Sequence, residues 1–310
     1  PDMESAVESD IGQLKTLVGL FKRIDGAIDP DEIVEEISDR LREELDYERE
    51  ARHMLLYRSV FSNRDEICVP EHILNLSTER LLTMSWLEGE GLSHFEGADQ
   101  AVRNRTAERL FEAWWSPFNT IGVIHGDPHL GNYSLSEDAS VLNLLDFGCV
   151  RIFPTSFVAG VVALKRALER DDFDGTATAY ESWGFQGLSR EMIETLNIWA
   201  RFIYGPIMDD RVRTIADGVK PSEYGRKEAF EVRKRLKALG GVRIPREFVF
   251  MDRAAIGLGA AYLRLGAHLN FYRLFEESAA DFSEEKLAAA QLKALEAADL
   301  SDSATDLISS

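Results

Sequence analysis

The residues best suited to chemistry lie between positions 123 and 153, where two apolar runs enclose a polar loop. His125-Gly126-Asp127 is followed by Asn132 five positions after the aspartate, and Asp146-Phe147-Gly148 begins fourteen positions after Asn132. Asp127 is suited to orient a hydroxyl group and accept its proton, as a catalytic base does. A carboxamide and a second carboxylate supply the oxygen ligands that Mg²⁺ prefers. These residue types indicate phosphoryl transfer from a Mg²⁺-bound nucleotide, with Asn132 and Asp146 as the metal ligands.

The order and spacing of the two motifs resemble those of protein kinases, in which HxDxxxxN precedes DFG. Pro128 and Gly131 disfavour a helix between Asp127 and Asn132, and the flanking apolar runs predict β-strands. A surface loop before a buried strand would explain either triplet taken alone. Both triplets in this order, each beside a predicted strand, favour the phosphoryl-transfer site, and we therefore predict ATP and Mg²⁺ as cofactors.

Helices on the N-terminal side must position this loop. Apolar residues at intervals of three and four predict an amphipathic helix over residues 3–22. Asp29 as N-cap, Pro30 at the first helical position and Glu32 predict the start of a second helix, which runs to about Leu55.

Three charged residues on the second helix resemble a motif of the UbiB family, the atypical protein-kinase-like proteins of ubiquinone biosynthesis that include the mitochondrial ADCK proteins. Glu44 and Asp46 match the ExD pair of that family, and Glu50 matches the glutamate that pairs with the ATP-binding lysine. The resemblance covers residues 1–153 with the motifs in the family's order, and it implies nucleotide-binding roles for all three carboxylates. Taken one at a time, each is equally explained as part of a solvated helix face.

Two β-type segments are predicted over residues 68–76 and 79–87. The second resembles the last strand of a kinase N-lobe, which implies that Met84 is the gatekeeper and that Trp86 belongs to the hinge that contacts adenine. Ser85 stands where the family usually has an acidic residue, a departure from the hinge pattern. A core strand ending at a glycine turn is the alternative for Met84 and Trp86.

The C-terminal half of the sequence is predicted to be helical. One helix spans about residues 99–120 and bends or ends near Pro117, and its aromatic stripe predicts a core position. The sequence from Gly257 to Ala261 resembles part of a dinucleotide fingerprint, but it lies within a helical pattern, which favours close helix packing.

Past the DFG motif the sequence leads almost directly into a helix that contains Phe157 and Val161. Protein kinases place an activation segment and an Ala-Pro-Glu sequence there to hold a peptide. No Ala-Pro-Glu follows in this sequence, so we expect no platform for a protein substrate.

The predicted fold is α+β and protein-kinase-like. We expect a partial N-lobe over residues 1–89 with the ExD-bearing helix, a helical C-lobe over residues 90–298 with the catalytic loop and DFG, and a disordered tail over residues 299–310. In the resembled family a lysine-bearing strand and a KxGQ motif precede the position of Pro1, and neither occurs in this sequence. We expect that the chain is N-terminally truncated relative to the family; the alternative is a degenerate member.

The amino-acid composition limits the kinds of partner that we expect the protein to bind. Lys and Arg number 35 against 54 Asp and Glu, and the resulting net charge of −19 disfavours nucleic acid, whose phosphates need clustered basic residues. Cys68 and Cys149 show no spacing typical of zinc or disulfide sites. No apolar run reaches the roughly 18 residues of a membrane span. We expect a cytoplasmic protein, with peripheral contact to a membrane as a further expectation.

Three functions from different classes remain. The first, favoured by the ExD resemblance, is a UbiB-type atypical kinase or ATPase that supports ubiquinone or isoprenoid-lipid metabolism, with a nucleotide and a lipid or quinone-like small molecule as partners. The second is a small-molecule phosphotransferase of the aminoglycoside or choline kinase type, because HGDxxxxN with a later DFG also occurs there. The third is a catalytically inactive, pseudokinase-like binding module, which the missing lysine strand favours.

Overall fold

The computed structural model of the 310-residue chain describes residues 3–22, 38, 45–216 and 218–301. The N-terminal helices among them are α1 (Met3–Lys22) and α3 (Tyr47–Val60). The bounds of α1 confirm the helix predicted over residues 3–22.

Short strands form two small sheets. The strands are β1 (Ile67–Cys68), β2 (Glu90–Gly91), β3 (Val123–His125), β4 (Tyr133–Leu135), β5 (Leu142–Leu144) and β6 (Val150–Ile152). The first sheet has the order β1-β5-β4-β2, with β1 parallel to β5 and the other pairs antiparallel. In the second, β3 and β6 are antiparallel and Ile124 lies opposite Arg151. The strand ends therefore bring together the loops that carry the two sequence motifs.

Helices make up most of the remaining chain. The longer ones are α4 (Gln100–Ile121), α5 (Thr155–Glu169), α6 (Phe173–Ser182), α7 (Arg190–Tyr204), α8 (Arg226–Ala238), α9 (Arg246–Leu265), α10 (Phe271–Ser278) and α11 (Glu284–Ala297). The short 3₁₀ turns are η1 (Leu74–Leu76), η2 (Leu92–Gly97), η3 (Leu130–Asn132), η4 (Gly205–Met208) and η5 (Pro221–Glu223). Helices with a small mixed sheet confirm the predicted α+β class. Every described helix is too short or too polar to span a lipid bilayer.

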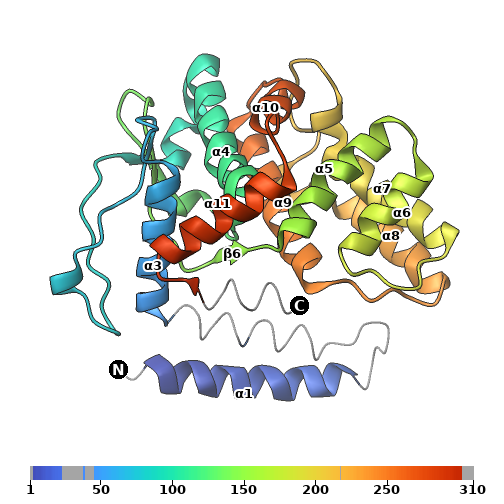
Figure 1. The fold of residues 1–310 in the computed structure, drawn as a ribbon, viewed down its shortest axis with the longest axis horizontal. Helices are drawn as coiled ribbons and strands as arrows, with labels where there is room; N and C mark the ends of the chain where they lie inside the picture. The colour runs from blue at the N-terminus through green and yellow to red at the C-terminus, as the bar shows by residue number, and fades with distance from the viewer. Residues whose placement is uncertain (1–2, 23–37, 39–44, 217, 302–310) are drawn as a thin grey trace.

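The central helix α4 is the main core element of the helical part, with α11 alongside it and α5 to α8 grouped to one side (Figure 1). Its side chains Trp114 and Phe118 are at most 2% exposed, as the aromatic stripe predicts. The helix continues past Pro117 to Ile121 and is capped by Gly122, whose φ of 66° is in the left-handed region that glycine adopts readily. Pro117 is therefore an interior residue of α4 and does not end it.

The helix predicted from Asp29 to Leu55 is interrupted before α3. Its first part lies mostly outside the described residues, and Asp46 is the N-cap of α3. The Oδ1 atom of Asp46 accepts a hydrogen bond of 2.9 Å from the amide of Arg49, one of the free amides at a helix start. A single helix through Asp46 was therefore a wrong prediction, and Glu50 lies in the first turn of a new helix.

Residues 68–87 form a hairpin whose pairing is less regular than that of the two strands predicted there. Backbone amides of Ile73 and Ser85 donate to the carbonyls of Thr83 and Glu71, each at 2.9 Å. The pairing is antiparallel but is limited to isolated bridges, such as that between His72 and Met84.

Two glycines of α9 allow close packing, as predicted for residues 257–261. A Cβ atom on Gly257 would lie 2.7 Å from Pro128, and one on Gly259 would overlap the ring of Tyr224. Both contacts are shorter than a real Cβ atom tolerates. Since Pro128 directly follows Asp127, α9 supports the motif loop from the C-terminal half of the chain.

One cluster of buried apolar residues extends from Met54 in α3 to Leu300 near the end of the described chain. Leu300 is 6% exposed, and residues 302–310 of the predicted tail lie outside the described residues. The division at residues 89 and 298 stays a prediction.

Candidate active site

The 125–132 loop begins at the end of β3, where its backbone lies very close to the backbone of the DFG segment. The Gly126 amide donates a hydrogen bond of 2.8 Å to the carbonyl of Cys149, which immediately precedes the neighbouring strand β6. A Cβ atom on Gly126 would collide with that same carbonyl oxygen. Glycine is therefore required here for close approach of two backbones, and this approach joins the loop to the DFG segment.

Gly126→Ala is expected to lower the free energy of unfolding by about 1–3 kcal/mol, because the added methyl group displaces the Cys149 carbonyl and weakens its hydrogen bond. Urea denaturation followed by circular dichroism measures the change. Gly97→Ala is the matched control, since a Cβ atom there meets no atom within 4 Å. Equal losses in the two variants would contradict the steric assignment.

His125 connects the two motifs from within the core. Its Nε2 atom lies 2.6 Å from the carbonyl oxygen of Asp146, and its Nδ1 atom lies 3.4 Å from the amide of Asp127. A carbonyl only accepts and an amide only donates, so Nε2 carries the proton and Nδ1 does not. Burial lowers the pKa of His125, against the opposing effect of the Asp146 and Asp127 carboxylates, which agrees with this neutral tautomer.

Asp127 and Asn132 are joined directly. The Asn132 Nδ2 atom donates to the backbone carbonyl of Asp127 at 3.0 Å and approaches its carboxylate Oδ2 at 3.4 Å. The turn η3 makes this contact possible, because it brings Asn132 back toward Asp127. Both contacts use the amide nitrogen, so the side-chain oxygen of Asn132 is directed elsewhere.

Asp146 and Glu50 meet at the DFG segment. The Oδ1 atom of Asp146 accepts from the amide of Gly148 at 2.9 Å, and the Oε1 atom of Glu50 accepts from the amide of Phe147 at 3.2 Å. Burial raises the pKa of the Glu50 carboxyl, the Phe147 amide opposes this effect, and the nearby Asp146 carboxylate raises the pKa further. Among the described residues, Glu50 forms no ion pair.

The donor set fits Mg²⁺. No cluster of three or more His, Cys, Asp and Glu side chains in the described residues is arranged to hold a metal ion by itself. A nucleotide-bound Mg²⁺ takes only one or two carboxylates or carbonyl oxygens from the protein. Asp146 Oδ2 and Asn132 Oδ1 accept no hydrogen bond within the described chain, so both oxygen atoms are available as ligands.

The outcome differs among the other residues that were predicted to bind the nucleotide. Glu44 lies outside the described residues. Asp46 uses one carboxylate oxygen to cap α3. Met84 is half-buried against the core, whereas Trp86 is 83% exposed, so the core-strand alternative is wrong for Trp86.

The chain just after Trp86 is attached to the sheet that carries the metal-ligand candidates. Asn143 Nδ2 donates to the Glu88 carbonyl at 3.0 Å, and β2 pairs with β4. A Cβ atom on Gly89 would lie 2.8 Å from the Leu135 carbonyl oxygen, so this approach too requires glycine. The predicted hinge is thus connected to the site through its backbone.

One buried residue of the site was missed in the sequence. The side chain of His53 is 1% exposed. Its Nδ1 atom donates a hydrogen bond of 3.1 Å to the carbonyl oxygen of Phe147. Glu50 and His53 thus bond the amide and the carbonyl of the same residue. Their spacing of three residues on a helix was the available signal, since residues at i and i+3 share a face.

Residues 1–179 match the family model described as the ABC1 atypical kinase-like domain. The chain is 22% identical over 289 residues to the atypical kinase COQ8, mitochondrial, of Saccharomyces cerevisiae, a match covering 89% of this chain and 55% of that protein. It is 32% identical over 143 residues to a probable protein kinase UbiB of Aliivibrio fischeri, covering 44% of this chain and 26% of that one. The chain thus spans about half or less of the length of these relatives.

The fold is similar to a solved structure described as the complex of Rv3197 with erythromycin from Mycobacterium tuberculosis. The TM-score is 0.64 at 21% sequence identity, covering 89% of this chain and 68% of that one. This similarity supports the kinase-like fold.

Proposed function

The chain belongs to the ABC1 atypical kinase-like family, and from this membership we propose that the complete protein is a Mg²⁺-ATP-dependent atypical kinase or ATPase whose active site contains Asp127, Asn132 and Asp146. The observation that carries the proposal is the connection among these residues. Asn132 bonds Asp127, and His125 bridges the backbones of Asp127 and Asp146.

Each residue has a distinct proposed role. Asp127 orients the attacking hydroxyl or water and accepts its proton. Asn132 and Asp146 hold Mg²⁺ through their unbonded oxygens, and the bound ion would neutralise charge on the nucleotide phosphates. Met84 and the backbone near Trp86 would contact adenine. The family resemblance is the basis for proposing nucleotide-binding roles for Glu44, Asp46 and Glu50.

A small acceptor or water suits the site better than a peptide. The segment after Gly148 enters β6 at Val150, and Pro154 caps α5, which begins at Thr155. No room in the chain remains there for a peptide-docking segment. From the resemblance to the UbiB family we propose a role in ubiquinone or other isoprenoid-lipid metabolism, with a lipid or quinone-like small molecule as partner. A cytoplasmic location beside a membrane surface stays a prediction.

The test is a turnover assay of the complete protein with Mg²⁺-ATP alone and with peptides, generic proteins or isoprenoid head-group analogues. We expect slow release of phosphate that the head-group analogues accelerate and the peptides do not. Chelation of Mg²⁺ should abolish the activity. Strong phosphorylation of a peptide, with no response to the small molecules, would replace this proposal with an ordinary protein kinase.

A further inference from the structure

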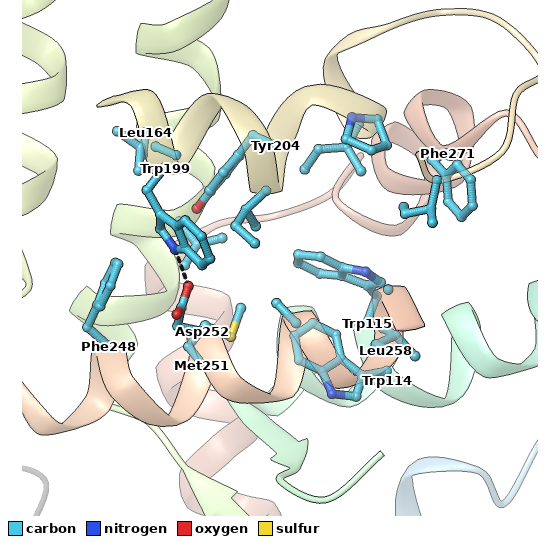
Figure 2. Close-up of a pocket in the computed structure, with 18 of the residues that line it drawn as sticks. Trp114, Trp115, Leu164, Trp199, Tyr204, Phe248, Met251, Asp252, Leu258 and Phe271 are labelled. Carbon is cyan, nitrogen blue, oxygen red and sulfur yellow. Dashed lines mark hydrogen bonds between the residues drawn. The ribbon is translucent and has the colours of Figure 1, made fainter. Parts of the chain in front are cut away.

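An aromatic cavity lies in the helical part of the molecule, apart from the site described above. Its volume is about 900 Å³ including the solvent at its mouth. Its walls come mainly from α4, α5, α7 and α9, and none of Asp127, Asn132 and Asp146 lines it (Figure 2). Apart from Asp252, its lining residues are apolar or aromatic, and they include no Lys, Arg, His or Glu.

The carboxyl group of Asp252 has one partner. Trp199 Nε1 donates a hydrogen bond to Oδ1, and Oδ2 has no hydrogen-bond or ion-pair partner in the described part of the chain (Figure 2). Asp252 lies left of the centre of the view, beside Trp199 and with Phe248 beyond it, whereas Phe271 lies at the right. The cavity therefore carries its carboxylate toward one end, and the other end is apolar.

Burial raises the pKa of Asp252 to about 6, although the Trp199 hydrogen bond opposes the shift. Since this is above the ordinary value of 3.8, the folded state binds the proton more tightly than the unfolded state. Folding is consequently penalised when the group is ionised above pH 6, and the penalty disappears as the pH falls below about 4. At neutral pH the cavity holds a largely ionised carboxylate without a counter-ion, at a cost to stability. Groups held in this way are characteristic of functional sites.

We propose that this cavity binds an apolar molecule that carries one protonated amine, with the amine on Asp252 and the apolar body among Trp115, Leu258 and Phe271. A cation would supply the missing partner of Oδ2 and would be attracted to the faces of the surrounding aromatic rings. The net charge of −19 also favours the approach of cations. A neutral ligand would fill the apolar end but would leave the carboxylate without a counter-ion.

Tryptophan fluorescence provides a direct measurement, because Trp114, Trp115, Trp183 and Trp199 line the cavity and the fifth tryptophan, Trp86, is exposed. The complete protein carrying Trp86→Phe is titrated with N,N-dimethyldodecylamine, below its micelle concentration, at pH 7.5. Dodecan-1-ol is the neutral probe with the same chain. We expect saturable binding of the amine, at least tenfold tighter than that of the alcohol.

Asp252→Asn keeps the acceptor for Trp199 and removes the charge. It should weaken binding of the amine at least tenfold, leave binding of the alcohol unchanged, and unfold at a higher urea concentration than wild type at pH 7.5. Asp281→Asn, the same change at an exposed position, should alter none of these. Equal affinity for amine and alcohol in wild type, no binding of the amine, or unchanged affinity in Asp252→Asn would each overturn the proposal. The comparison of amine and alcohol affinities in wild type tests the proposal even if Asp252→Asn fails to fold.

Discussion

Asp127→Asn in the complete protein is expected to lower the turnover of ATP by about 10² or more while largely preserving nucleotide affinity. General-base catalysis contributes about that factor, and a carboxamide at position 127 cannot accept the proton. The loop should keep its shape, because its main hydrogen bond, from Asn132 Nδ2, goes to the backbone carbonyl of residue 127 and not to the side chain. Phosphate release under saturating Mg²⁺-ATP measures turnover, and calorimetry measures affinity.

Glu137→Gln is the matched control for this experiment. Glu137 is an exposed carboxylate between β4 and β5, and the same chemical change there should leave turnover within twofold of wild type, roughly, as for most surface substitutions. Turnover of Asp127→Asn close to that of wild type would remove Asp127 from the catalytic role.

Asp146→Asn is expected to reduce affinity for Mg²⁺-ATP by about tenfold to a hundredfold. The asparagine oxygen can still accept from the Gly148 amide, which preserves the turn, but the negative charge directed at the metal is lost. Asn132→Ala should weaken the same equilibrium, since it removes the second oxygen ligand.

Calorimetry with ATP in the presence of Mg²⁺, and again with EDTA, separates the metal-dependent part of the affinity. The variants should differ from wild type with Mg²⁺ and resemble it with EDTA. Equal Mg²⁺-ATP affinity in wild type and both variants would contradict the assignment of these residues as metal ligands.

Short motifs carried most of the information about the candidate site. His125-Gly126-Asp127, Asn132 and the DFG triplet lie on adjacent loops because each is attached to a strand, and antiparallel pairing of β3 with β6 brings the strand ends together. The family membership was likewise readable in the sequence, since the motifs occur in a characteristic order. Helical periodicity located α1 and α4, because contacts at i+3 and i+4 are local properties of the chain.

Tertiary packing decided what these local patterns could not. Periodicity favoured a continuous helix through Asp46, yet the backbone breaks there and the carboxylate caps a new helix. Alternation predicted regular strands near Met84 and Trp86, but the segment makes only isolated bridges, and strands of this kind depend on neighbours to complete their hydrogen bonding.

The sequence by itself determined the fold class, the family and the residues proposed to perform phosphoryl transfer, because their chemistry and spacing are written within short stretches. Only the tertiary structure placed His53 against Phe147, Pro128 against Gly257 and the Asp252 carboxylate against Trp199 in an aromatic cavity. The members of these pairs lie far apart in the chain. Their contacts follow from how helices pack around the common core, and no local periodicity encodes which distant faces will meet.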